Sequence, residues 1–285
     1  MKILSYAAAA LCIVLAALVV AVLVSRYRFR ALIAGEAGGL LAGAATSVGA
    51  EQVAARWSGL PAPVQRYLRF AISPSAPAIR TLRLQHTGSI RTGPGGPWLP
   101  LEGAEFFAVA EPGFVWHGVA HAAPLTWIEV RDHLLAGRGS MLVKLESTLT
   151  LADAQGAEID QGARMRWLAE AMWFPYALVG DRIHWEALSD RSARAMLLQP
   201  GHPVSLVFEF DGEGKLLRME GERYRDLGGG TSELARWQGE CADYREFDGL
   251  RVPTSARVSW LLKDGPFEYF RIQVTDLEYN ASSPY

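Results

Sequence analysis

The segment from Arg166 to Pro175 constrains the fold most, because it is almost wholly apolar and lies midway along a chain whose remainder resembles β-strands. Its two charged residues, Arg166 and Glu170, are four positions apart and share one face of a helix. Large side chains surround them, namely Trp167, Leu168, Met172, Trp173 and Phe174. A helix that is apolar nearly all round is buried. We therefore expect a buried helix over about 160–175 that acts as a plug or lid.

On both sides of this segment, apolar residues alternate with a period of two, which is typical of strands. Candidate strands before it occupy about 80–91, 103–111, 114–121, 125–131 and 139–151. Those after it include Val204 to Phe210 and about 215–225, 235–247, 251–263 and 267–280. Short turns with Gly and Pro favour antiparallel pairing, and a sheet this wide curls. The predicted fold class is mainly β (α+β): a curved antiparallel sheet or incomplete barrel, with the helix as a central insertion over its open mouth.

The amino-terminal stretch Ile3–Val24 contains no charged residue. At about 1.5 Å per residue it is long enough to cross a hydrocarbon core of about 30 Å. A signal peptide would have a shorter apolar core and small residues before its cleavage site. We therefore expect residues 1–30 to be an uncleaved, single-pass transmembrane anchor.

Residues 31–57 are rich in Ala and Gly, which favours a linker, helical in part, between the anchor and the rest of the chain. The next segment has one amphipathic helical stripe, formed by Val64, Tyr67, Leu68 and Ala71. We expect this helix to begin a β half-barrel domain over residues 58–282.

Several motifs together resemble an uncharacterised bacterial family of membrane-anchored proteins that is catalogued only as a domain of unknown function. They are Leu60-Pro61, Pro63-Val64, Arg66-Tyr67-Leu68, Gly139 with Met141, Arg166, Leu168-Ala169-Glu170, Trp173-Phe174-Pro175, Phe208 with Phe210-Asp211, Trp260, Phe270-Arg271 and Glu278-Tyr279. The order sheet, helix, sheet is also similar to the lipoprotein-carrier (LolA/LolB-like) fold, in which an incomplete barrel holds acyl chains under a helical lid. The first resemblance implies no activity and no catalytic residues, and the second is one of architecture.

Three interpretations of Arg166 and Glu170 remain open. In the first, burial raises the pKa of Glu170 for a catalytic role, although the sequence supplies no nucleophile beside it. The other two involve no catalysis. Either the two residues form an ion pair that lets a mostly apolar helix carry two charges, or Arg166 binds the head group of a ligand while Glu170 orients it. The candidate ligand-binding residues are Arg166, Glu170, Trp167, Trp173, Phe174, Phe208 and Trp260.

Sequence patterns disfavour most other functions. The chain has no Gly-x-Ser-x-Gly motif, P-loop or dinucleotide fingerprint, so we expect no cofactor and favour a protein that is not an enzyme. His117 and His121 lie in a predicted strand without further zinc ligands, so we expect no metal site, and Asp132-His133 fits a turn. A net charge of -2 gives no support for nucleic-acid binding.

The function that fits these features is a membrane-anchored module that binds a lipid or other acyl-bearing amphiphile in an apolar cavity under the central helix. The alternative is a non-catalytic structural or envelope-assembly protein with a filled core. The three arginines after the apolar run favour a cytoplasmic domain, whereas the resemblance to carriers favours the periplasmic or extracytoplasmic side of the cell membrane, which we expect.

Overall fold

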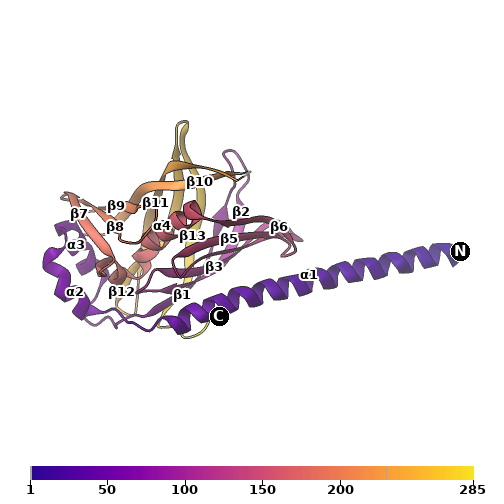
Figure 1. Cartoon of the computed structure of the whole chain (residues 1–285), viewed down its shortest axis with the longest axis horizontal. Helices are drawn as coiled ribbons and strands as arrows, with labels where there is room; N and C mark the ends of the chain where they lie inside the picture. Colours follow the sequence, from indigo (N-terminus) through magenta and orange to yellow (C-terminus); the bar gives the residue numbers. More distant parts are fainter. Residues whose placement is uncertain (1, 229) are drawn as a thin grey trace.

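We describe a computed structural model of the chain over residues 2–228 and 230–285. Within these residues, one antiparallel sheet of 13 strands has the order β6-β5-β4-β3-β2-β1-β13-β12-β11-β10-β9-β8-β7 (Figure 1). The first six strands are β1 Thr81–Ile90, β2 Leu99–Ala108, β3 Gly113–Ala123, β4 Thr126–Leu135, β5 Arg138–Leu145 and β6 Leu149–Gln155. The others are β7 Ile183–Ser189, β8 Ser192–Leu197, β9 Val204–Phe210, β10 Leu216–Gly228, β11 Thr231–Phe247, β12 Leu250–Leu262 and β13 Gly265–Tyr279. The predicted fold class is confirmed.

The two halves of the sheet are two meanders joined by the pairing of β1 with β13. One strand expected at 139–151 is in fact the hairpin of β5 and β6. Its turn uses Glu146 and Ser147 at φ of 49° and 58°, so no Gly or Pro marks it in the sequence. The short strands β7 and β8 were not expected. Most residues of β7 are exposed, so its sequence does not alternate clearly between apolar and polar side chains.

The central helical insertion is present, with different ends from those expected. Helix α4 spans Ala157–Glu170 and is followed by two 3-10 turns, η2 (Ala171–Trp173) and η3 (Pro175–Val179). It packs against β4 and β5 on one side and against β9 and β10 on the other. In Figure 1 it lies within the curve of the sheet. Helix α4 therefore closes the open side of the half-barrel.

A glycine allows α4 to lie directly on the sheet. A Cβ atom added at Gly139 of β5 would be 2.7 Å from the backbone oxygen of Ile159 and 2.9 Å from the Cβ of Ala163. The amide of Gly139 also donates a hydrogen bond of 2.7 Å to Asp160 Oδ1. The absence of a side chain thus permits both the close packing and the hydrogen bond.

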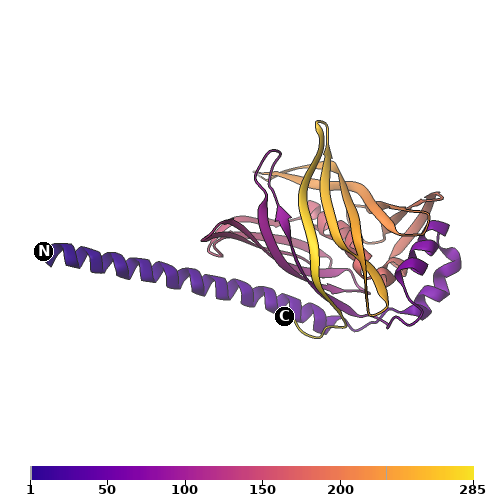
Figure 2. The same cartoon turned by 180° about the vertical axis from the view of Figure 1, so that it is seen from behind.

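The long helix α1 (Lys2–Gly43) extends well past the expected anchor. Its amino-terminal part projects away from the rest of the chain in both views (Figures 1 and 2). Its carboxyl-terminal part lies on the outer face of β2 and β3, where Phe29, Ile33, Ala37 and Leu41 are buried with Phe106 and Val115. Much of the region expected to be a linker, 31–57, is therefore helical. Ile33, Ala37 and Leu41 pack on the sheet, whereas an added Cβ at Gly35 or Gly39 would have nothing within 4 Å.

Three short helical elements follow α1: α2 (Ala50–Arg56), η1 (Trp57–Gly59) and α3 (Ala62–Ala71). In α3 the expected stripe of Val64, Tyr67, Leu68 and Ala71 is buried. The ring of Tyr67 lies 5.4 Å from that of Phe210, so α3 seals the core at one end of the sheet.

We expect Gly139→Ala to destabilise the protein by about 1–3 kcal/mol, because the added methyl group would push α4 away from β5. Urea unfolding of the full chain in detergent micelles, followed by tryptophan fluorescence, measures this change. Gly93→Ala is the control, since an added Cβ at Gly93 has nothing within 4 Å, and its effect should be less than about 0.5 kcal/mol. Equal effects of the two substitutions would show that the close approach of α4 is unimportant.

Candidate functional site

A cavity of about 200 Å³ lies between the α4–η2 segment and the concave face of the sheet, and we call it the inner cavity. Its walls are mainly aromatic and methionine side chains: Trp116, Trp173, Trp237, Tyr269, Phe270, Met141, Met172 and Met219. Small or aliphatic residues complete the apolar lining, including Ile90, Ala169, Gly239, Ala256, Val258 and Ile272. The cavity therefore suits an apolar group.

A β-bulge shapes one wall of the inner cavity. The pairing of β12 with β13 shifts register between Val258 and Ser259, which leaves Tyr269 without a directly paired partner on β12. Neighbouring residues of a regular strand point to opposite faces, and a bulge changes that alternation. Both Tyr269 and Phe270 consequently line the cavity.

The polar end of the inner cavity is an ion cluster around Arg166. All three nitrogens of its guanidinium donate to carboxylates at 2.8 Å: Nε to Glu170, one terminal nitrogen to Asp132 and the other to Glu105. The guanidinium carbon also lies 4.9 Å from the ring centroids of Phe114 and Trp116. Arg166 is thus fully engaged by the protein itself.

The cluster contains more carboxylates than cations, and protonation reduces this imbalance. Burial raises the pKa of Glu105 well above its usual value, against the opposing influence of Arg166, and burial also raises the pKa of Glu170. Glu105 Oε2 and Glu170 Oε2 are buried and have no hydrogen-bond partner among the described residues, which disfavours a negative charge on both carboxyl groups. For Arg166, burial alone would lower the pKa, but the three carboxylates outweigh burial and raise it. The cluster therefore favours a proton on Glu105, whose pKa burial raises well above its usual value.

A neutral histidine supports the aromatic wall of the cavity. The indole nitrogen of Trp116 donates a hydrogen bond of 2.9 Å to His86 Nε2. Burial, together with the charge of Arg166, lowers the pKa of His86 to about 3. The imidazole therefore stays neutral and accepts from Trp116, which fixes the indole at the edge of the cavity.

A second arginine, Arg223 of β10, lines the inner cavity beside Gly162 of α4. Its side chain is half-buried. Within residues 2–228 and 230–285 it forms no hydrogen bond or ion pair, in contrast to Arg166. The cavity thus has one cation that the described protein leaves unpaired.

The predicted site residues fall into two groups. Arg166, Glu170 and Trp173 line the inner cavity, and the expected ion pair of Arg166 with Glu170 is present. The other four lie outside the lining: Trp167, Phe174, Phe208 and Trp260. Trp167 contacts Phe174 at 5.7 Å between ring centroids, Phe208 contacts Trp185 at 5.2 Å, and Trp260 stacks behind Tyr269 at 5.8 Å.

Sequence reasoning missed several lining residues and misplaced one pair. Asp132 and His133 are in β4, not in a turn: Asp132 faces Arg166, and His133 faces outward to Glu36 at 3.0 Å. The sequence does indicate Glu105 as a buried acid. It lies in β2 two positions before Phe107, so the two side chains point to the same face of the sheet. An acid at such a position needs a buried partner.

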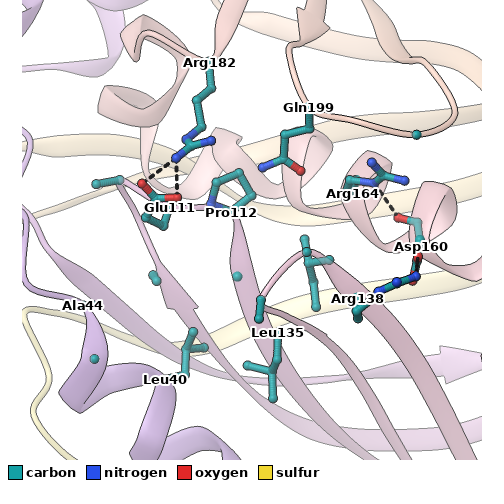
Figure 3. A pocket seen from close by; sticks show the side chains of 18 of the residues that line it. Leu40, Ala44, Glu111, Pro112, Leu135, Arg138, Asp160, Arg164, Arg182 and Gln199 are labelled. Atoms are coloured by element: carbon teal, nitrogen blue, oxygen red, sulfur yellow. Dashed lines mark hydrogen bonds and ion pairs between the residues drawn. The ribbon is translucent and has the colours of Figure 1, made fainter.

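A second, open groove of about 1400 Å³ lies between the end of α1 and the start of α4. Figure 3 shows Leu40 of α1 on one side and Asp160 and Arg164 of α4 on the other. Arg182 pairs with Glu111 at 2.7 Å and Arg138 with Asp160 at 3.1 Å. Arg164 donates to the backbone oxygen of Asp160 at 3.0 Å. The groove is wide and its charges are satisfied, so the inner cavity is the better candidate site.

We expect Arg166→Met to destabilise the protein by about 3–5 kcal/mol at neutral pH, because three buried or half-buried carboxylates would lose their cation. Arg166 opposes the increase that burial causes in the pKa values of Glu105 and Glu170, so without it both folded-state pKa values lie further above the unfolded ones. As the pH falls from about 7 to about 5, the free energy of unfolding should rise more in the variant than in the wild type, because these carboxyl groups take up protons in the folded state. Unfolding measured by denaturant over this pH range tests the effect.

The control for this experiment is Arg138→Met. The Arg138 side chain is 82% exposed in its pair with Asp160, and exposed pairs contribute about 0–1 kcal/mol. A similarly small and pH-independent loss for Arg166→Met would contradict a structural role of the cluster.

The solved structures to which this chain is similar are distant in sequence. No curated protein matches the chain significantly. Solved structures with a similar fold include a domain described as an outer membrane lipoprotein-sorting protein from Vibrio parahaemolyticus (TM-score 0.37, 10% identity, 70% of this chain and 85% of that one). A LolA superfamily protein from Nitrosomonas europaea has a TM-score of 0.34 and 9% identity, over 76% of this chain and 91% of that one. A DUF1329 family protein from Desulfovibrio piger has a TM-score of 0.43 and 14% identity, over 82% and 95%.

A family model matches residues 51–272, which include α2, α3, the central helix and nearly all of the sheet. The expected resemblance to a family of unknown function is thereby confirmed. The chain belongs to the family of unknown function DUF6544.

Proposed function

We propose that this protein is a membrane-anchored binding module that holds the apolar part of a small amphiphile in the inner cavity. The observation that carries the proposal is the combination of an aromatic and methionine-rich cavity with one unpaired cation, Arg223, in its wall. Ligand sites combine a mostly apolar lining with a few polar groups that orient the ligand. The inner cavity has both.

The volume of the cavity limits the ligand. Small-molecule sites are usually about 300–1,000 Å³, whereas the inner cavity has about 200 Å³. An engineered apolar cavity of about 150 Å³ accepts benzene, so a ring or a short chain fits without rearrangement. Met141, Met172 and Met219 line the cavity, and their flexible side chains adapt to ligands of different shape. A longer acyl chain would be admitted by their movement.

The head group of the ligand would be anionic and would bind Arg223. The sequence suggested Arg166 for this role, but all three nitrogens of Arg166 already donate to carboxylates. An added anion would have to displace one of them. A carboxylate or phosphate at Arg223 would instead form a charge-assisted hydrogen bond without breaking another.

The amino-terminal part of α1 would anchor the module. Its most apolar window is 0% buried and has a mean hydropathy of 3.1, and such a surface suits the hydrocarbon core of a bilayer. The periplasmic or extracytoplasmic side remains our proposal for the rest of the chain. Two of the arginines that favour the cytoplasm bind the sheet, since Arg26 stacks on Trp127 and Arg30 pairs with Glu129.

The small volume of the inner cavity also favours a second candidate function. A structural or envelope-assembly protein needs no ligand, and a core with one modest void would serve it equally well. The two functions differ in whether the void takes up an amphiphile.

Octanoate and octanol share a tail and differ in head group, so they test the cavity and Arg223 together. We expect both to change the tryptophan fluorescence of the full chain in lipid nanodiscs in a saturable way, with octanoate binding more tightly. Ala256→Phe should weaken both about tenfold or more by filling the cavity. Arg223→Gln should weaken only octanoate, by about tenfold, because a charge-assisted hydrogen bond contributes about 1.5–3 kcal/mol.

Two substitutions on the outer face of neighbouring strands are the controls. Ala242→Phe adds the same side chain at an exposed position of β11, and Arg218→Gln removes a cation of β10 that pairs with Glu209 at 2.7 Å. Neither should alter binding, and melting temperatures should confirm that all variants fold. If neither compound binds the wild-type protein, the binding function is wrong and the structural one is favoured.

We expect the mature protein to keep its apolar segment. Amino-terminal sequencing of the membrane-extracted protein should find a start before Ile3, and protease added to intact spheroplasts should degrade the rest of the chain. A start at or after Ser25 would show that the segment is a removed signal sequence. Protection from the protease would place the domain in the cytoplasm.

A further inference from the structure

Two turns of the sheet lie beside α1 at the point where its apolar run ends. The hydroxyl of Ser25, the residue after Val24, donates a hydrogen bond of 2.6 Å to the backbone oxygen of Ser147 in the β5–β6 turn. The guanidinium carbon of Arg26 lies 4.8 Å from the ring centroid of Trp127, next to the β3–β4 turn. Figures 1 and 2 show the tip of β6 close to α1. A bilayer crossed by Ile3–Val24 would therefore have its surface at these turns.

Both turns present apolar side chains to solvent. Leu125 in the β3–β4 turn is 85% exposed, and Leu149 and Leu151 at the start of β6 are 60% and 51% exposed. Residues 122–128, which include the β3–β4 turn, contain no charged side chain, and the β5–β6 turn contains one, Glu146. The first residues of β6, 149–152, are also uncharged. By contrast, the β12–β13 turn, far from α1, contains Lys263 and Asp264. The exposed leucines are thus placed at the two turns nearest to the expected membrane surface.

The contact between α1 and the sheet holds these turns at a fixed level along the helix. Arg30 pairs with Glu129 at 3.0 Å, and Glu36 pairs with His133 at 3.0 Å. His117 and Ser147 also donate to Glu129. Burial alone would raise the pKa of Glu129, but these hydrogen bonds lower it to about 2, so its carboxylate stays charged. These contacts fix the positions of the two turns along the axis of α1, level with Ser25.

We propose that the β3–β4 and β5–β6 turns form a second membrane contact, in which Leu125, Leu149 and Leu151 enter the lipid surface of the bilayer that α1 crosses. Trp127 and Arg26 lie at the same level, and tryptophan is enriched at the interface while arginine is attracted to anionic head groups. The partner is therefore an anionic lipid surface. This inference rests on the proposed anchoring by α1, but it does not require a ligand in the inner cavity.

The second contact would fix how the half-barrel sits on the membrane. A single helix leaves an attached domain free to tilt, whereas a helix and two turns define a plane. Ile90 lines the inner cavity and is the last residue of β1. It pairs with Leu99 of β2, and Leu101 of β2 pairs with Ala120 near the end of β3. Ile90 therefore lies at the same end of the sheet as the β3–β4 turn. The contact would hold that end of the cavity toward the lipid.

A depth-sensitive fluorophore tests the inference in the full chain. In a Cys12→Ser background, Leu149→Cys is labelled with nitrobenzoxadiazole, and the protein is placed at one copy per nanodisc of phosphatidylcholine and phosphatidylglycerol. Leu188→Cys is the control, since Leu188 is also exposed but lies on β7 at the opposite edge of the sheet. With acyl-brominated lipids, the label at position 149 should lose most of its fluorescence, and the label at position 188 should lose none.

The outcomes separate this inference from the anchoring on which it rests. If the protein stays with the nanodisc but the label at position 149 is not quenched, the turns do not touch lipid and the inference is wrong while the anchor stands. If the protein leaves the nanodisc, the anchoring is wrong, and the inference fails with it. Equal quenching at positions 149 and 188 would also overturn it, because the whole sheet would then lie on the membrane without a specific contact.

Discussion

The arrangement of the protein depends on the buried ion cluster of Arg166. A guanidinium and three carboxylates at the interior of a half-barrel are tolerated only when each charge meets an opposite one at close range. Because Glu105 is on β2, Asp132 on β4 and Glu170 on α4, the cluster fixes the rotation and the level of the helix relative to two strands. At the other end of α4, Asp160 binds the amide of Gly139. The helix is thus held at both ends.

The inner cavity follows from how α4 is held. Where α4 faces β11 and β12, the opposing residues are small: Ala169 on the helix, Gly239 on β11 and Ala256 on β12. A helix fixed by ion pairs at one side cannot move inward to close the gap that these small residues leave. The large rings of Trp116, Trp237 and Tyr269 then form the walls of the space without filling it. The same interaction that orders the lid therefore maintains the void beneath it.

Helix α1 combines two environments in one continuous element. Its first part is apolar all round and exposed, whereas its last part buries only Phe29, Ile33, Ala37 and Leu41 against the sheet. Between these parts, Ser25 binds Ser147 of the β5–β6 turn, and Arg26 and Arg30 contact β4. These contacts place two apolar turns beside the end of the apolar run. Attachment, orientation and the position of the cavity are consequently linked through a single rigid helix.

The sequence alone determined the fold class, the position of the central helix and the stripe of α3, because each depends on a local period of apolar residues. It also indicated the pairing of Arg166 with Glu170, which needs only helical spacing. It did not reveal the hairpin at Glu146-Ser147, whose turn has no Gly or Pro, or the strands β7 and β8, whose side chains are largely exposed. Residues 31–43 resembled a linker because Ala and Gly are frequent there, whereas the contacts of Ile33, Ala37 and Leu41 with the sheet are tertiary.

The composition of the candidate site was decided by tertiary structure. Glu105 and Asp132 are 61 and 34 positions from Arg166 in the chain, and only the order of strands in the sheet brings them to one guanidinium. Whether Arg166 or Arg223 is left unpaired depends on these contacts, so it could not be inferred from the helix alone. Likewise, Tyr269 and Phe270 share the cavity because of a bulge that alternation does not predict. Local periodicity thus determined which segments become helix and strand, and long-range packing decided which of their side chains meet.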